Sequence, residues 1–515
     1  RSPILESIVR IPSRRPSAVA SKTSTDVATH TAWRVFRKMF VSLLVSSLVA
    51  VAPSAIQAQE RLSAQSSAGI DSLFTTYAHS GSPGCAVGVF QNGATVFARG
   101  YGFANLTYDV PITPETRFTV GSVSKQFTAA TIALLVRAGR ISLDDDVRKY
   151  VPELPVYSPP VRVRHLVHHT SGLRDFWELV SLAGMRLDDG YGVDDMFALA
   201  IRQKGLNFTP GAEYRYSNTG YLTIGVLVKR VTGQSLRRFA DSAMFAPLGM
   251  NETMFLDNHN EIVSRRAAAY SPNGKGWQID IWNNDLVGQG GIVTSLEDLQ
   301  KWDENFYTAK VGGREFIDLM QTTEPLNNGS KNVYAFGVLM ETYRGQRLVA
   351  HTGATGGYRA ALFRFPDQHT SFAMMCNAST ANTDALCLRM ADVVLRESLG
   401  AKTMVPEGAG VAASSARAGG AIALAERRAI VGRYVSTELN DSVWEVALGR
   451  DSSSLQLLRP RNAPIPLVAT DSAYQYSTSS GGITLRFSPP AKGRSAGFVL
   501  DGSRVSAIRF ARITP

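Results

Sequence analysis

Residues 122–138 read Ser-Val-Ser-Lys-Gln-Phe-Thr-Ala-Ala-Thr-Ile-Ala-Leu-Leu-Val-Arg-Ala. The run from Gln126 is largely apolar, contains no proline and stops at Gly139, which predicts a buried helix with a glycine C-cap. Ser122 then lies at the helix N-terminus, where free N–H groups and the helix dipole favour developing negative charge. Lys125 follows one turn later on the same face, close enough to take the serine proton. Because a charged lysine is costly on so apolar a helix, we expect its pKa to fall toward that of a usable base.

The tetrapeptide Ser122-Val123-Ser124-Lys125 has the pattern Ser-x-x-Lys, which arises by chance about once in a chain of this size. Its interpretation therefore depends on two further elements. They are Tyr216-Ser217-Asn218 and His351-Thr352-Gly353. In this order the three elements resemble the serine β-lactamase and penicillin-binding-protein superfamily, specifically its class C branch. That branch includes β-lactamases, D-alanyl-D-alanine carboxypeptidases, D-aminopeptidases and family VIII esterases. Turns such as Gly288-Gln289-Gly290-Gly291 extend the resemblance over about residues 70–400.

The resemblance implies a nucleophilic mechanism on Ser122. The serine would attack an ester or amide carbonyl, and water would hydrolyse the acyl-enzyme. Lys125 and Tyr216 are both candidate bases, and by resemblance they act together, with positive charge near the phenol lowering its pKa. Tyr216 could instead be an ordinary aromatic residue ahead of a buried helix. Asn218 would bond to Lys125 or to a substrate carbonyl, or would cap that helix, and both roles could hold.

An oxyanion needs two convergent backbone donors. The N–H of Ser122 supplies one, and by resemblance the N–H of Ala354 supplies the other. Thr352 and Gly353 belong to the predicted substrate-binding residues, and glycine here lets the backbone approach the substrate closely.

His351 departs from the pattern of β-lactamases and carboxypeptidases, which usually carry lysine here to bind a substrate carboxylate. Histidine is mostly neutral near pH 7 and offers a hydrogen bond but little Coulomb attraction. A His-x-Gly box is similar instead to D-aminopeptidases and some esterases. We therefore expect a serine hydrolase of small ester or amide substrates, D-amino-acid peptides among them. The alternatives are a class C β-lactamase, a D-alanyl-D-alanine carboxypeptidase or a catalytically silent binding protein.

Strand patterns at the two ends of the region 69–400 predict an α+β fold. Residues 85–91 and 95–102 alternate around Asn92-Gly93, a strong hairpin signal. Residues 348–351, 358–365 and 371–377 form a second strand group, and the chain between the groups is mostly helical. An antiparallel sheet flanked by helices, beside an all-helical subdomain, is the β-lactamase/transpeptidase-like fold that the resemblance implies.

The remaining segments have distinct compositions. Residues 1–58 are interpreted as an N-terminal extension and a signal peptide, with a short apolar run at 39–52 and cleavage near Ala58-Gln59. Residues 401–427, rich in Ala, Gly and Ser, predict a linker. Residues 428–515 contain short alternating runs that predict a small all-β barrel, similar to the lipocalin-like domains of D-aminopeptidase-type members. We expect a periplasmic or secreted protein without stable membrane insertion.

The net charge of +11 is not evidence for a nucleic-acid partner. Residues 1–38 alone hold eight Lys and Arg against two acidic residues, and the remaining positive charge is dispersed along the chain without a basic cluster. The expected partner is a small-molecule or peptide substrate. His165, His168 and His169 are close in sequence, but no carboxylate follows at a ligand spacing, and we expect neither a metal nor a cofactor.

Three cysteines do not make a disulfide framework. We interpret Cys376 and Cys387 as small buried residues. The alternative is one disulfide bond between two of the three cysteines, if the protein resides in an oxidising compartment.

Overall fold

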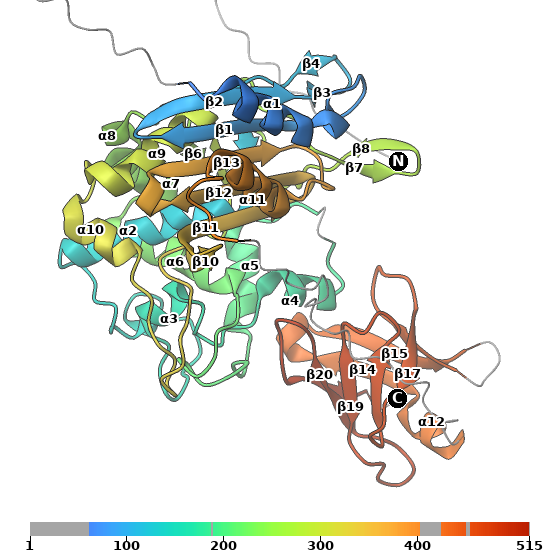
Figure 1. Ribbon diagram of the computed structural model, residues 1–515. Helices are drawn as coiled ribbons and strands as arrows, with labels where there is room; N and C mark the ends of the chain where they lie inside the picture. The colour runs from blue at the N-terminus through green and yellow to red at the C-terminus, as the bar shows by residue number, and fades with distance from the viewer. Residues whose placement is uncertain (1–60, 187–188, 402–423, 450–453, 514–515) are drawn as a thin grey trace, which may run out of the picture. The chain divides into compact units, whose positions relative to one another are not determined.

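The computed structural model describes residues 61–186, 189–401, 424–449 and 454–513. Its centre is a six-stranded antiparallel sheet in the order β10-β11-β12-β13-β1-β2 (Figure 1). The strands are β1 (Cys85–Gln91), β2 (Ala94–Tyr101), β10 (Leu339–Tyr343), β11 (Gln346–Thr355), β12 (Tyr358–Phe365) and β13 (Thr370–Cys376). The sheet joins the two strand groups from the ends of the region, and the predicted α+β architecture is confirmed.

Strand β1 is buried on both faces because helices cover both sides of the sheet. Cys85, Val87 and Val89 point into one core, beside α1 (Ala64–Leu73) and α11 (Thr383–Val394). Ala86 and Phe90 point into the other core, with the helical part of the domain (Figure 1). The period of two in a strand thus distributes alternate side chains between two separate cores.

Helix α2 (Lys125–Arg137) lies in the middle of the second core, with ten of its residues buried. Around it are helices that hold its apolar side chains away from water. They are α3 (Val163–Val167), α5 (Val193–Ile201), α6 (Asn218–Thr232), α7 (Leu236–Ala240), α9 (Leu296–Thr308) and α10 (Gly313–Met320), whereas α4 (Phe176–Leu182) packs against α5 and α6. The predicted helical stretch also contains short strands, including β5 (Phe118–Thr119), β6 (Met254–Phe255) and β9 (Ile292–Thr294).

Cys85 of β1 lies directly opposite Cys376 of β13, and the two form a disulfide bond. Cys376 is buried, as expected, and it takes part in the one disulfide bond that the sequence analysis had left open. Register explains the pairing, because antiparallel partners lie close enough across the sheet for their sulfur atoms to bond. Cys387 of α11 is a free, buried thiol.

The C-terminal region is a closed barrel of eight strands, β14 to β21, and the predicted β barrel is confirmed. Its strands are β14 (Gly432–Ser436), β15 (Ser442–Leu448), β16 (Leu455–Leu458), β17 (Ile465–Ala469), β18 (Gln475–Thr478), β19 (Thr484–Phe487), β20 (Gly497–Asp501) and β21 (Ile508–Arg512). Aromatic side chains fill the interior, among them Tyr434, Trp444 and Phe498. Closure leaves no sheet edge unpaired.

Helix α4 belongs to two cores at once. Leu179 and Leu182 pack among the interior side chains of the barrel, whereas Phe176 and Val180 pack against α5 and α6. The indole N–H of Trp444 also donates to the carbonyl of Leu182 at 3.0 Å. The barrel is therefore docked on α4, one of the helices of the N-terminal α+β region.

The predicted N-terminal extension with its signal peptide (1–58) and most of the predicted linker (401–427) fall outside the described residues. Within the described residues, the helices are too short or too polar to cross a bilayer.

Candidate active site

Ser122 lies in a 3₁₀ turn, η2 (Gly121–Ser124), and the α-helix proper begins at Lys125. The turn rests against the end of β11, and two glycines permit that approach. Gly121 has φ +50°, and a Cβ there would lie 2.6 Å from the Ala354 nitrogen. A Cβ on Gly353 would lie 2.0 Å from the Val120 carbonyl oxygen and 3.0 Å from the Ser122 nitrogen. The two proposed oxyanion donors, the N–H groups of Ser122 and Ala354, therefore come from adjoining backbone segments.

Lys125 is fully buried, and its Nζ reaches three oxygen atoms. These are Ser122 Oγ at 3.1 Å, Asn218 Oδ1 at 2.9 Å and the Gln289 carbonyl. The amide and carbonyl oxygens can only accept, so they use two N–H bonds, whereas the serine hydroxyl can also donate. A neutral amine satisfies this arrangement by accepting the Ser122 proton. Burial lowers the Lys125 pKa well below its ordinary value, the Asp175 carboxylate raises it, and the Arg504 charge lowers it.

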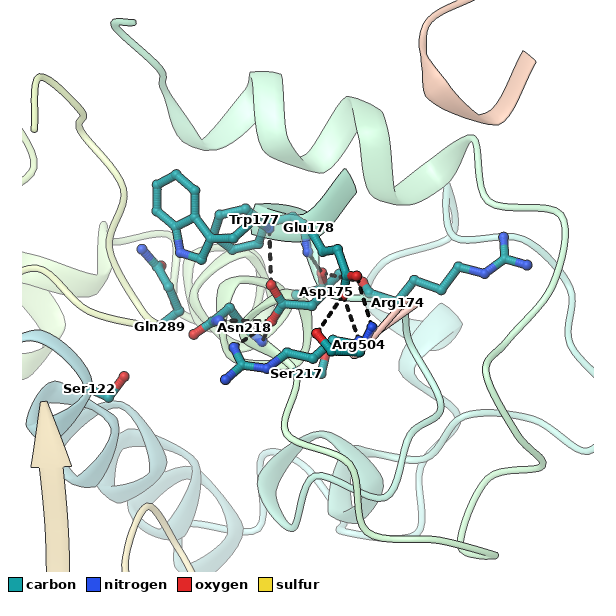
Figure 2. Close-up of polar contacts among 12 residues, drawn as sticks. Ser122, Arg174, Asp175, Trp177, Glu178, Ser217, Asn218, Gln289 and Arg504 are labelled. Carbon is teal, nitrogen blue, oxygen red and sulfur yellow. Dashed lines mark hydrogen bonds and ion pairs between the residues drawn. The ribbon is translucent and has the colours of Figure 1, made fainter. Parts of the chain in front are cut away.

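Asp175 orients Asn218. Its Oδ2 accepts the Asn218 backbone N–H at 2.7 Å and the side-chain amide at 2.8 Å (Figure 2). The amide nitrogen is thus directed at Asp175 and the amide oxygen at Lys125. Asn218 is the first residue of α6, and the capping role falls to Ser217, whose hydroxyl accepts from Gly220 N–H at 3.3 Å.

Asp175 is a site residue that the sequence analysis missed. Its position just before α4, where its Oδ1 accepts the Trp177 N–H at 3.0 Å, is a common N-cap pattern that could have marked it.

Tyr216 packs its ring between His169, at 4.2 Å between centroids, and the Lys125 amine, 4.7 Å from the ring centroid. Its hydroxyl is buried, and no group in the described part of the chain completes a hydrogen bond of standard geometry to it. Burial raises the pKa of the phenol, while the nearby Ser122 hydroxyl and the Arg504 charge lower it. The hydroxyl therefore has hydrogen-bonding capacity available beside the serine.

His351 of β11 has both ring nitrogens engaged. Nδ1 lies 2.6 Å from the Thr352 carbonyl, which can only accept, so Nδ1 carries the proton. Nε2 then accepts from the Tyr334 hydroxyl at 2.8 Å. Burial, with a smaller effect of the Lys125 charge, lowers the pKa of His351 to about 3. The side chain is therefore neutral near pH 7.

The three histidines that lie close together in the sequence are held by backbone groups. His165 Nδ1 accepts the Arg162 N–H, His168 Nδ1 lies 2.9 Å from the Tyr334 carbonyl, and His169 Nδ1 accepts the Ser217 N–H at 3.1 Å. His169 thus supports the Tyr216 segment, a position that the sequence analysis did not assign to it. Nowhere in the described ranges do three or more His, Cys, Asp or Glu side chains group as a metal site.

A cavity of about 640 Å³ contains the predicted residues Ser122, Tyr216, Asn218, His351, Thr352, Gly353 and Ala354 in its lining. Lys125 lies beneath this surface, bonded to Ser122. Aromatic walls come from Trp177, Tyr214 and Trp282. The lining also includes Arg266, Arg359 and Arg504, which the sequence analysis did not identify, because only the tertiary structure brings them to the same cavity as the serine.

Comparison with known proteins identifies the family of the chain. The β-lactamase family model matches residues 70–394. A D-aminopeptidase of Brucella canis is 30% identical over 313 residues, which are 61% of this chain and 60% of that protein. A D-aminopeptidase of Brucella anthropi is 29% identical over 306 residues, 59% of this chain and 58% of that protein. The chain thus spans about 60% of the length of the curated relatives that it matches.

Solved structures share the fold. The octameric penicillin-binding protein homologue of Pyrococcus abyssi superposes with a TM-score of 0.56 at 23% identity, covering 84% of this chain and 96% of that chain. The D-amino acid amidase of Ochrobactrum anthropi SV3 gives a TM-score of 0.55 at 21% identity, over 65% of this chain and 99% of that chain.

Proposed function

The chain belongs to the β-lactamase family, and from this premise we propose that it is a serine hydrolase that cleaves small ester or amide substrates through an acyl-enzyme on Ser122. The observation that carries the proposal is the 3.1 Å contact between Ser122 Oγ and a fully buried lysine amine at the floor of a cavity. A buried amine is more readily neutral, and a neutral amine is a base.

In the proposed reaction, Lys125 takes the hydroxyl proton as Ser122 Oγ forms a bond to the substrate carbonyl carbon. The N–H groups of Ser122 and Ala354 stabilise the oxyanion. Lys125 then returns its proton through the Tyr216 hydroxyl to the leaving nitrogen or oxygen, and the C–N or C–O bond breaks. Water attacks the acyl-enzyme with the same groups as base, and Ser122 regains its proton.

We favour D-amino-acid amides or peptides as the substrate class. The similarity to D-aminopeptidases supports this choice, as does the neutral His351, which offers a substrate carboxylate no charge. The aromatic walls of the cavity suit a side chain of apolar character. A carboxylate-bearing β-lactam is the second candidate, because the three arginines of the cavity lining provide positive charge that His351 lacks.

One panel of substrates tests the proposal. Purified protein is assayed with p-nitrophenyl esters, with D- and L-amino-acid p-nitroanilides and with nitrocefin. We expect D-anilides to be cleaved faster than their L-enantiomers and faster than nitrocefin. Faster turnover of nitrocefin than of every anilide and ester would favour the second candidate.

A labelling experiment tests the nucleophile. A fluorophosphonate should modify Ser122, and Ser122→Ala should remove both label and turnover. Ser124→Ala is the matched control in the same peptide, because the Ser124 hydroxyl accepts the Ile292 N–H at 3.0 Å and lies outside the cavity lining. An adduct on any residue other than Ser122 would contradict the assignment.

We also propose that the protein is exported to the periplasm or secreted. The Cys85–Cys376 disulfide supports this location, because disulfides persist in oxidising compartments and are rare in the cytosol. Cell fractionation of the native host, with the mature N-terminus determined by mass spectrometry, tests it. Recovery of the full chain in the cytosol with both thiols reduced would contradict it.

A further inference from the structure

The loop between β20 and β21 is fixed to helix α4 by one carboxylate. Glu178 accepts hydrogen bonds from the Ser503 N–H at 3.0 Å, the Ser503 hydroxyl at 3.2 Å and the Arg504 N–H at 2.5 Å. A Cβ on Gly502 would lie 1.9 Å from Glu178 Oε1, so a larger residue there would collide with this carboxylate. The loop backbone therefore fits this helix closely.

The carbonyl of Arg504 is held as well. It accepts the Asn207 side-chain amide at 2.8 Å and the Asp175 N–H at 3.3 Å. With both backbone groups of Arg504 bonded to the catalytic region, the barrel aims one side chain at the serine cavity. Figure 2 shows this side chain beside Asp175 and Asn218, on the side that faces Ser122.

The Arg504 guanidinium contacts the acid–base groups. Its Cζ lies 5.2 Å from the Tyr216 ring centroid, and its Nη1 lies 3.9 Å from Asp175 Oδ2. The side chain is 46% exposed and forms part of the cavity lining. An arginine keeps its positive charge throughout the pH range of an enzyme assay.

We infer that Arg504 is a positioning residue of the barrel whose charge favours the deprotonated forms of Tyr216 and Lys125, so that the barrel completes the acid–base machinery. The inference rests on the proposed function, since it deepens the role of the same site. The C-terminal barrel thereby takes part in the reaction.

Charged and titratable groups face Tyr216 from several elements, and they differ in sign. They are Lys125 of α2, His169 after α3, Asp175 before α4, Tyr214 on its own segment, Tyr221 of α6, Tyr334 before β10, and His351 of β11. Burial lowers the pKa values of His169 and His351, so both are neutral at pH 7. The Asp175 carboxylate opposes deprotonation of the phenol and of the lysine. Arg504 counters that carboxylate.

The direction of the effect follows from charge. Burial is the largest cause at both groups, raising the pKa of Tyr216 and lowering that of Lys125, and the Arg504 charge lowers both. Without the guanidinium both pKa values rise, and the base becomes available only at higher pH. Allowing for solvent screening of a half-exposed side chain, we expect the acidic limb of the rate profile to move up by about one pH unit.

The experiment measures the second-order rate of fluorophosphonate labelling between pH 5 and 10, which needs no knowledge of the substrate. Arg504→Gln should move the acidic limb of the pH–rate profile up by about one pH unit. At pH values below that limb, labelling of the variant should be about tenfold slower than labelling of the wild type. Arg504→Lys, which restores a charge, should recover part of the shift. Arg461→Gln is the control, because it removes another contact between barrel and catalytic region, the ion pair with Asp189, which lies outside the cavity lining.

Each result has a distinct meaning. An unchanged limb in Arg504→Gln overturns the inference, and a KM increase confined to carboxylate-bearing substrates would then identify Arg504 as a substrate-binding residue. An equal shift in Arg461→Gln also overturns it, because docking alone would be responsible. If the wild type is not labelled on Ser122, the proposed function itself fails. Labelling of Ser122 with an unshifted Arg504→Gln profile rejects the inference alone.

Discussion

Glu438→Gln should destabilise the protein through one buried ion pair. Glu438 Oε2 lies 2.6 Å from Arg174 Nη1, and the two side chains are 3% and 2% exposed. Removing one partner of a buried pair leaves the other charge uncompensated, which costs roughly 3–5 kcal/mol. Arg174 keeps two other acceptors, Gln203 Oε1 at 3.0 Å and the Ala507 carbonyl at 3.2 Å. Glutamine also keeps an oxygen at the site, so we expect the lower end, about 3 kcal/mol.

Urea unfolding followed by tryptophan fluorescence and far-ultraviolet circular dichroism, with the disulfide oxidised, measures this loss. A second variant, Arg174→Met combined with Glu438→Gln, removes the uncompensated charge and should recover at least half of it. Arg461→Gln breaks an ion pair with Asp189 that is half exposed, and it should lose far less stability. A cost below about 1 kcal/mol for Glu438→Gln would refute the reasoning, because the pair would then be hydrated and the barrel not docked in solution.

Three further outcomes are expected. Lys125→Met should lower turnover and serine labelling about a thousandfold or more without loss of unfolding free energy, since a buried amine is replaced by an apolar chain; retained labelling would exclude Lys125 as the base. His351→Lys should raise the ratio of kcat/KM for nitrocefin to that for p-nitrophenyl butyrate about tenfold, by a charge-assisted hydrogen bond to the carboxylate, and an unchanged ratio would show that His351 is not the selector. Thiol titration should find no reactive cysteine in the folded protein, one after unfolding (Cys387) and three after reduction, whereas three before reduction would contradict the disulfide.

Short-range patterns predicted much of this structure. The apolar run after Ser122 marks a buried helix, the Asn92-Gly93 turn marks a hairpin, and alternating runs mark the barrel strands. Each depends on residues close in sequence, where spacing alone determines which side chains share a face.

Other features depend on tertiary structure, and the sequence did not reveal them. The Cys85–Cys376 pairing requires the register of β1 on β13, which turns and propensities do not determine. Arg504 reaches the cavity from a loop whose backbone bonds to Glu178 and Asn207, residues more than 290 positions away in the sequence. The roles of Ser122 and its neighbours came from a family resemblance, and they stay predictions until the variants are assayed.

The place of β1 in the sheet has a consequence for biosynthesis. One neighbour, β2, follows it after a tight turn, but the other, β13, carries a cysteine 291 residues further along the chain. During synthesis β2 becomes available to pair with β1 long before β13 does, and we expect the other edge of β1 to lack its partner in that interval. Such an edge is prone to pair with other chains. Folding through so distant a contact is also slow. We therefore expect that protection of this edge until β13 is synthesised raises the yield of folded protein.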